Sequence, residues 1–297
     1  MMRPCYVVDS FAARPLLGNA AGVLLDGAGL DAETMQRIAA ELKHSETAFP
    51  LPAREPGTDL HLRWFTPESE VAFCGHATLA AFHVLVEEAG RIPVPADGAA
   101  RIAFTCKSGK LNVELSRLQG KLRILIETPA SRFEPVQVPG ALLASLGLVP
   151  EALDPRWPPQ RSLVLEGNLY LAVRDRGALA RCRPDGAGLQ EIARRMGVAG
   201  TVVFTLDPEP GVDAALRCFF PGYGILEDPV TGSAAGQLGS LLQSLRPSRL
   251  PRRLLFTQGD EMGRPGSIEV EVRDDAGSAR GWIGGNAVTV LRGEMEL

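Results

Sequence analysis

Alternating hydrophobic and polar residues predict strands along the first part of the chain. In residues 60–65, Leu60, Leu62 and Trp64 alternate with polar side chains, the period of two that turns one face of a strand toward a core. Similar patterns predict further strands at residues 5–9, 47–51, 102–106, 111–115 and 122–127. Pro129 closes this first series of elements.

Hydrophobic residues at helical spacing predict two helices between these strands. The first begins at Asp31, a residue type that favours the N-cap, and carries Met35, Ile38 and Leu42 on one face. The second follows Cys74-Gly75-His76-Ala77-Thr78 and continues as an apolar run to about Glu88. Because this run is apolar on all sides, we expect a buried helix.

The second part of the chain repeats much of this order. We expect a helix at 142–146, a strand at 163–173, a helix at 189–196, strands at 202–206 and 214–220, and closing strands. Before the closing strands, Gly232-Ser233-Ala234-Ala235 opens an apolar helix that carries leucines and stops near Pro247.

The repetition extends to individual residues. Arg63-Trp64-Phe65-Thr66-Pro67 and Arg217-Cys218-Phe219-Phe220-Pro221 share the pattern Arg-x-Phe-x-Pro at an offset of 154 positions. A glycine opens the apolar helix in each part, Gly75 and Gly232, at an offset of 157 positions. We therefore predict two similar α/β halves, residues 1–128 and 129–285, related by a pseudo-twofold axis, with a small-molecule site in the cleft between them.

Composition and charge narrow the function classes. The 297 residues include 31 basic and 35 acidic side chains, a net charge of −4 without a basic run, which argues against a nucleic-acid partner. We find neither an apolar stretch of membrane-spanning length nor the layout of a signal peptide. The five cysteines are scattered without a CxxC, and the four histidines form no ligand motif, so we expect a reduced cytoplasmic protein without a transition-metal site.

The two glycine-led helix starts are candidates for anion binding. The first N–H groups of a helix lack intrahelical partners and carry partial positive charge, and glycine lets a ligand approach closely. Together, Gly75 and Gly232 predict a site for a carboxylate, although each glycine alone would also suit a tight turn. Ser233 would either cap its helix or donate to the ligand.

Three titratable residues lie near these features. His76, beside a positive helix end, is expected to be neutral at pH 7. Asp228, just before the second helix start, fits either an N-cap or a proton-transfer partner. Glu46 enters an apolar strand, where desolvation would raise its pKa toward the range useful for acid/base catalysis. From the local sequence alone, however, a solvent-facing glutamate is the safer interpretation.

The ordered set of motifs resembles the PhzF-like phenazine biosynthesis family, relatives of diaminopimelate epimerase. The resemblance covers nearly the whole chain, and only Ala20 departs from it, where members commonly have proline. The motifs are Tyr6-Val7-Val8-Asp9-Ser10-Phe11, Leu17-Gly18-Asn19, Ser45-Glu46-Thr47, Phe65-Thr66-Pro67, Cys74-Gly75-His76-Ala77-Thr78, Glu227-Asp228-Pro229-Val230-Thr231-Gly232-Ser233-Ala234-Ala235-Gly236 and Gly285-Asn286-Ala287-Val288.

The resemblance implies a fold, an activity and roles for residues. The fold would be α/β (α+β), diaminopimelate epimerase-like, with each half a curved mixed sheet around a central helix and a final strand, 286–297, crossing back to the first half. The activity would be a biosynthetic isomerisation of a small carboxylated metabolite by a homodimer, without metal or organic cofactor. The implied catalytic residues are Glu46, as general acid/base, His76 and Asp228, and the implied substrate-binding residues are Gly75, Gly232 and Ser233.

Two other functions stay open. A racemase or epimerase would use Cys74 as one acid/base. Its counterpart in the second half, taken three residues before Gly232, is Pro229, which transfers no proton. Cys74 would therefore need Glu46 or Asp228 as its partner. A buried apolar role for Cys74 is the simpler alternative. A non-catalytic small-molecule binder would use the same cleft but would require neither acid.

Overall fold

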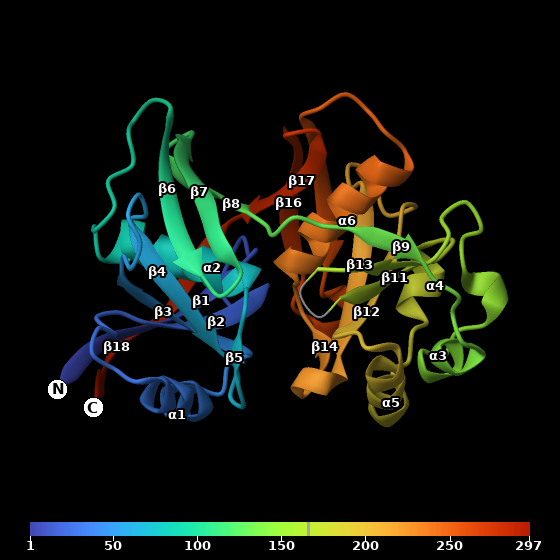
Figure 1. Ribbon diagram of the computed structural model, residues 1–297, viewed down its shortest axis with the longest axis horizontal. Helices are drawn as coiled ribbons and strands as arrows, with labels where there is room; N and C mark the ends of the chain where they lie inside the picture. Colours follow the sequence, from blue (N-terminus) through green and yellow to red (C-terminus); the bar gives the residue numbers. More distant parts are fainter. Residues whose placement is uncertain (165–166) are drawn as a thin grey trace. The chain divides into compact units, whose positions relative to one another are not determined.

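The structure, a computed structural model, describes residues 1–164 and 167–297, and its contacts divide the chain into two units (Figure 1). The first unit comprises Met1–Thr128 and Trp282–Leu297, and the second comprises Pro129–Gly281. The chain therefore leaves the first unit once and returns to it with its last segment. The return begins at Trp282, slightly before the position 286 expected from the sequence.

The first unit is built from a mixed β-sheet and three helical segments. Its elements are β1 (Met2–Ser10), β2 (Asn19–Leu24), α1 (Ala32–Leu42), β3 (Glu46–Pro52), β4 (Leu60–Phe65), β5 (Glu70–Val71), α2 (Gly75–His83), the π-helical η1 (Val84–Glu88), β6 (Ala99–Cys106), β7 (Gly109–Leu118), β8 (Lys121–Glu127) and β18 (Ala287–Glu296). The pairs β2–β3 and β4–β6 are parallel, and the other pairs are antiparallel. The last strand, β18, pairs with β1 along its whole length.

Helix α2 is the centre of this unit. Every residue from Gly75 to Phe82 is buried, and the helix contacts β1, β2, β3, β8 and β18, strands that are spread across the sheet. An apolar sequence without a polar face can form a stable helix only where protein surrounds it. The predicted buried helix to Glu88 is thus confirmed, and its last turn, η1, is π-helical.

The second unit repeats this arrangement. Its elements are β9 (Phe133–Pro135), α3 (Gly140–Ser145), η2 (Pro150–Ala152), β10 (Gln160–Ser162), β11 (Asn168–Ala172), α4 (Arg176–Ala180), α5 (Gly186–Met196), β12 (Gly200–Thr205), β13 (Ala214–Phe220), η3 (Pro221–Tyr223), β14 (Ile225–Asp228), α6 (Gly232–Leu245), β15 (Arg252–Gln258), η4 (Asp260–Met262), β16 (Gly266–Asp275) and β17 (Ser278–Gly285), which runs on into the first unit. The pairs β11–β12 and β13–β15 are parallel, as β2–β3 and β4–β6 are. The apolar helix α6 takes the place of α2, and a Cβ on its Gly239 would lie 2.6 Å from Val270 of β16.

Helices α1 and α5 confirm the internal duplication. Each follows an aspartate N-cap, Asp31 and Asp185, and each ends at a residue in the left-handed conformation, Lys43 and Gly197. Both pairs are separated by 154 positions, the offset of the Arg-x-Phe-x-Pro motifs. The two halves are therefore similar in structure as well as in sequence.

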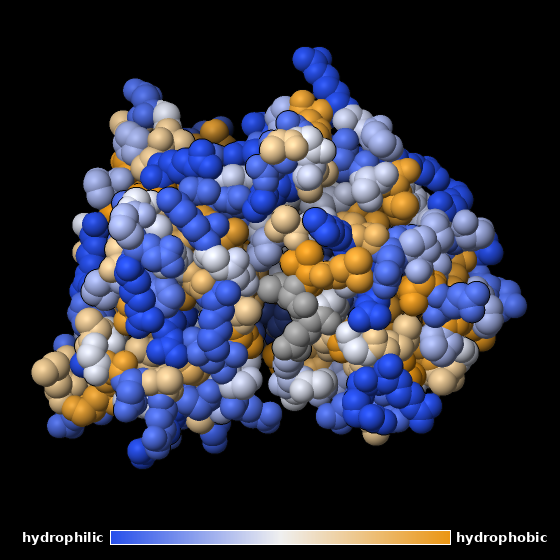
Figure 2. Space-filling view, viewed as in Figure 1, coloured by the Kyte–Doolittle hydropathy of each residue, from blue (hydrophilic) through white to orange (hydrophobic). Residues whose placement is uncertain are grey.

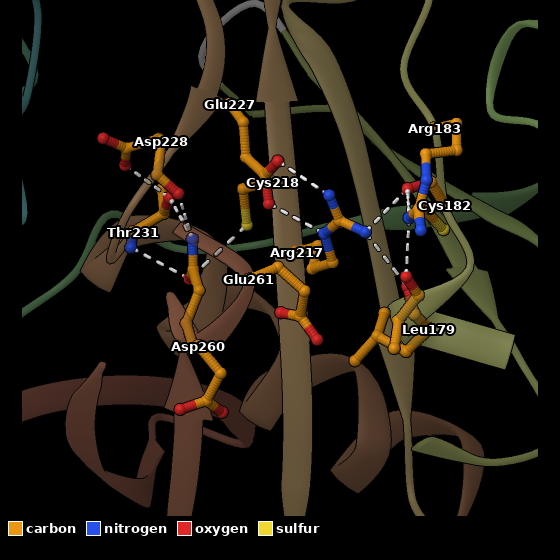
Figure 3. Close-up of polar contacts among 12 residues, drawn as sticks. Leu179, Cys182, Arg183, Arg217, Cys218, Glu227, Asp228, Thr231, Asp260 and Glu261 are labelled. Carbon is orange, nitrogen blue, oxygen red and sulfur yellow. Dashed lines mark hydrogen bonds and ion pairs between the residues drawn. The ribbon is translucent and has the colours of Figure 1, made fainter. Parts of the chain in front are cut away.

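The two motif arginines form equivalent ion pairs. Arg63 binds Glu70 through both carboxylate oxygens at 2.6 and 2.9 Å, and Arg217 binds Glu227 in the same way at 2.7 and 2.8 Å (Figure 3). Each guanidinium also lies over the phenylalanine of its own motif, at 4.9 and 5.3 Å from the ring centroid. The motif is thus a structural clamp between adjacent strands rather than part of the chemistry.

One strand prediction, 163–173, is wrong in its first half. Strand β11 begins only at Asn168, because Gly167 has a φ of +74° and its N–H donates to the carbonyl of Val164 in a turn. A Cβ at Gly167 would lie 2.5 Å from the carbonyl oxygen of Ser162. Residues 165–166 of that prediction lie outside the described residues.

The surface mixes polar and apolar residues. On the face drawn in Figure 2, hydrophilic side chains are interspersed with smaller hydrophobic areas. Large exposed hydrophobic residues occur in both units, Leu16 and Leu118 in the first and Leu163 and Leu226 in the second. Over the described ranges, we find no helix with the length and apolar character needed to cross a membrane.

Removal of the Arg217 side chain should strongly destabilise the second unit. Its side chain is 5% exposed, and its loss would leave the carboxylate of Glu227 buried without its cation. We expect Arg217→Ala to lower the free energy of unfolding by about 3–5 kcal/mol. Arg194→Ala is the matched control, since Arg194 pairs with Glu191 on the solvent-exposed surface and its loss should leave the free energy of unfolding almost unchanged. Equal losses in urea denaturation would contradict this difference.

Candidate active site

Glu46 and His76 meet at the start of the central helix. Glu46 is the first residue of β3, which is held parallel to β2 by the pairing of Ala21 with Glu46. His76 is the second residue of α2, whose N-cap is Cys74. The Oε2 atom of Glu46 lies 3.2 Å from Nε2 of His76, and the two side chains are 14% and 5% exposed.

Three further side chains surround the His76 ring. The Ser45 hydroxyl lies 3.1 Å from Nε2, while the Asn19 amide nitrogen and the Cys74 sulfur lie 3.3 and 3.4 Å from Nδ1. The first turn of α2 is also tied to β1, because Ser10 donates its hydroxyl to the His76 carbonyl at 2.7 Å. The imidazole is thereby held between a carboxylate on one nitrogen and a thiol and an amide on the other.

The His76 ring is neutral. Burial lowers the pKa of His76 to about 3, and the nearby His44 lowers it further in the same direction. Because the ring is neutral, the 3.2 Å approach of Nε2 to the Glu46 carboxylate is a polar contact rather than an ion pair. A neutral ring agrees with the expectation from the sequence, but its cause is desolvation rather than the positive helix end.

Glu46, Cys74 and His76 also form the kind of group that could hold a metal ion. One ligand atom from each lies within 4.8 Å of the others. However, Cys74 lies at Nδ1 and Glu46 at Nε2, and a neutral imidazole offers a lone pair on only one of these two nitrogens. The three groups are arranged as a chain through the ring, which suits proton transfer better than tripodal coordination.

The start of α6 in the second unit is built differently. Its N-cap is Thr231, whose hydroxyl donates to Oδ2 of Asp228 at 2.5 Å (Figure 3). Gln258 joins the two residues, since it donates to the Asp228 carbonyl at 2.8 Å and accepts the Thr231 N–H at 3.0 Å. The N-cap alternative for Asp228, and that for Ser233, are therefore wrong. Gly232 is buried and Ser233 is partly buried in the first turn of α6.

The duplication shows which groups have counterparts in the other unit. Glu46 opens β3 as Gly200 opens β12, and a Cβ at Gly200 would lie 2.3 Å from the Phe219 carbonyl oxygen. A side chain at this position would clash with that backbone oxygen, so Gly200 offers no equivalent of Glu46 in the second unit. The N-cap Cys74 corresponds to the N-cap Thr231, so the counterpart that the sequence suggested for Cys74, Pro229, is wrong. Neither Thr231 nor Pro229 carries a thiol, so a mechanism with one cysteine at each helix start remains excluded.

Sequence reasoning missed four polar residues around these helix starts. Asn19 and Ser45 lie within motifs shared with the family, but nothing local to the sequence indicated that both face one imidazole. Thr231 was detectable, because it stands directly before Gly232 as Cys74 stands before Gly75. Gln258 is distant in sequence, and only the parallel pairing of β13 with β15 brings it near.

Comparison with known proteins identifies the family. Residues 8–293 match the profile of the phenazine biosynthesis-like protein family, PhzC-PhzF. The chain is 33% identical to the uncharacterized isomerase YddE of Escherichia coli K12, covering 100% of this chain and 99% of that protein. It is 38% identical to the uncharacterized isomerase PA3578 of Pseudomonas aeruginosa, covering 98% and 97%. The crystal structure of a Bacillus anthracis PhzF-family protein superimposes with a TM-score of 0.88 at 26% identity, over 100% of both chains.

The fold is also shared with epimerases. A hydroxyproline epimerase of Agrobacterium vitis matches with a TM-score of 0.70 at 13% identity, over 99% of this chain and 92% of that one, a likeness of fold alone. Fold and relatives together define an isomerase whose substrate is not identified. The chain belongs to the PhzF-like phenazine biosynthesis-like family, as its motifs indicated.

The buried neutral His76 should make stability depend on pH. The pKa of His76 is about 3 in the folded protein, against 6.5 for a histidine in the unfolded chain. Below pH 6.5 the unfolded chain therefore binds a proton that the folded protein does not. We expect the free energy of unfolding to decrease by up to about 1.4 kcal/mol per pH unit as pH falls from 6.5 to 5. His76→Asn should remove the part of this dependence that His76 contributes, while His61 and His83, whose pKa values burial also lowers, keep theirs. An equal slope in both proteins would show that His76 does not contribute.

Proposed function

We propose that this isomerase moves a proton between carbons of a small carboxylated metabolite, with Glu46 as its general acid/base. The observation that carries the proposal is the Glu46 carboxylate, whose Oε2 atom lies 3.2 Å from Nε2 of a buried neutral histidine at the start of the central helix. A neutral imidazole holds the carboxylate in one orientation without neutralising it. The carboxylate therefore stays able to accept a proton.

The helix starts would bind the substrate carboxylate. Neither N-cap side chain, Cys74 or Thr231, accepts a backbone N–H from the first turn of its own helix. The N–H groups of Gly75 in the first unit and of Gly232 in the second are the proposed anion donors. We propose that Ser233 and Asp228 of the second unit orient the rest of the substrate, with the Asp228 carboxylate prepared by the Thr231 hydroxyl.

In the proposed reaction, Glu46 takes a proton from one carbon and returns it to another. The electrons of the broken C–H bond move into the substrate, shift its double bond, and form the new C–H bond when the proton returns. No group is consumed, and the reaction needs neither metal nor organic cofactor. The absence of a Glu46 counterpart at Gly200 supports a single acid/base over a symmetrical pair. We further propose that the enzyme works as a cytoplasmic homodimer.

Solvent deuterium uptake tests the role of Glu46. The protein is incubated in deuterated water with pools of small carboxylated metabolites, and label uptake is followed by mass spectrometry. We expect Glu46→Gln to reduce uptake by about 10²–10⁴-fold, the contribution typical of a general acid/base. Glu41→Gln, an exposed glutamate of α1, is the matched control and should retain full uptake. Undiminished labelling by the Glu46→Gln protein would refute the proposal.

An epimerase that uses Cys74 is the second candidate, because the Cys74 sulfur lies 3.4 Å from Nδ1 of His76. If Glu46 acts alone, Cys74→Ala should retain most deuterium uptake, since the thiol then serves packing. Cys74→Ser is the control for shape. A Cys74→Ala protein with correct folding by circular dichroism but without uptake would favour the epimerase.

A further inference from the structure

The ring of His76 meets partners of fixed hydrogen-bonding character. Asn19 and His76 are both buried, at 2% and 4% exposure, and the Asn19 Nδ2 atom lies 3.3 Å from Nδ1 of the ring. An amide nitrogen donates and cannot accept. A neutral ring carries a single proton, so Nδ1 must accept the Asn19 hydrogen and Nε2 must carry the proton.

The groups at Nε2 agree with this assignment. Oγ of Ser45, 3.1 Å from Nε2, can accept from Nε2–H, and Oε2 of Glu46 lies close to the same nitrogen at 3.2 Å. The Ser45 hydroxyl hydrogen has its own acceptor, because it points to Oδ1 of Asn19 at 3.5 Å. The other amide atom of Asn19 is thus engaged as an acceptor, which keeps Nδ2 turned toward the ring.

We infer that Asn19 is a positioning residue that fixes His76 as the Nε2–H tautomer and so places the single ring proton on the nitrogen that faces Ser45 and Glu46. The consequence for catalysis rests on the proposed function; the tautomer itself does not. Cys74 then faces the unprotonated Nδ1, where its S–H can only donate. This arrangement places the ring in support of Glu46 and not of a thiolate.

The backbone holds Asn19 firmly in this position. Asn19 opens β2 opposite Ser10 of β1, the residue whose hydroxyl binds the His76 carbonyl. The preceding Gly18 has a φ of +62°, and a Cβ there would lie 2.1 Å from the Ser10 carbonyl oxygen. The same strand pair therefore fixes both the amide of Asn19 and the first turn of α2.

Nuclear magnetic resonance of the histidine ring nitrogens tests the tautomer. In the wild-type protein, the His76 signals, assigned by their loss in His76→Asn, should show a protonated Nε2 and an unprotonated Nδ1. In Asn19→Asp, the carboxylate can only accept, so Nδ1 should become protonated, alone or together with Nε2. The charged groups that face the ring, Glu46 and His44, are unchanged in this variant.

Asn168→Asp is the matched control. Asn168 is a buried asparagine at the start of β11, the strand of the second unit that corresponds to β2. This variant should leave the His76 signals unchanged. A wild-type ring protonated at Nδ1, or an unchanged ring in Asn19→Asp, would overturn the inference. If the aspartate variant fails to fold, the same ring measurement can be made on Asn19→Ser, whose side chain is smaller and uncharged. A mixture of the two tautomers is expected in that variant.

Deuterium uptake separates this inference from the proposed function. If the inference and the proposed function are both correct, Asn19→Asp loses deuterium uptake while Asn168→Asp retains it. A wild-type Nε2–H tautomer together with full uptake by Glu46→Gln would leave the inference standing and the proposed function refuted. A wild-type Nδ1–H tautomer together with lost uptake in Glu46→Gln would do the reverse.

Discussion

The proposed chemistry of this protein depends on the burial of one imidazole at the first turn of a helix that is itself buried. Desolvation keeps His76 neutral, and a neutral ring can bind the Glu46 carboxylate without forming an ion pair that would bring in a second charge. The ring needs fixed partners on both nitrogens, because a buried polar group without them is costly. Ser45 and Glu46 on one side and Asn19 and Cys74 on the other supply these partners.

The duplicated fold provides the frame but not the chemistry. Each unit has an apolar central helix, a mixed sheet and an Arg–Glu clamp, and each central helix begins with a glycine. The residues at the two helix starts have diverged: the first unit has Cys74 and His76, and the second has Thr231 and Ser233. At the position of Glu46, the second unit has Gly200 packed against backbone. The similar frames thus present different functional groups.

The sequence predicted the frame well and the site only in part. Period-two and helical patterns located most elements, and the two Arg-x-Phe-x-Pro motifs revealed the duplication, because such patterns reflect burial directly. The strand predicted at 163–173 failed because the turn at Gly167 interrupts an otherwise apolar run. Asn19 and Ser45 could not be assigned to His76, since hydrogen bonds between residues far apart in sequence leave no local pattern. Family resemblance singled out Glu46, whose local sequence favours a solvent-facing residue.

The central claim is that one carboxylate both removes and returns the proton. Once a substrate is known, it can be prepared with deuterium at the donor carbon and converted in ordinary water under single-turnover conditions. A single acid/base retains the removed deuteron, so part of the label should appear at the acceptor carbon of the product. Complete replacement by solvent hydrogen, with the same result in Cys74→Ala and in wild type, would contradict proton return by Glu46.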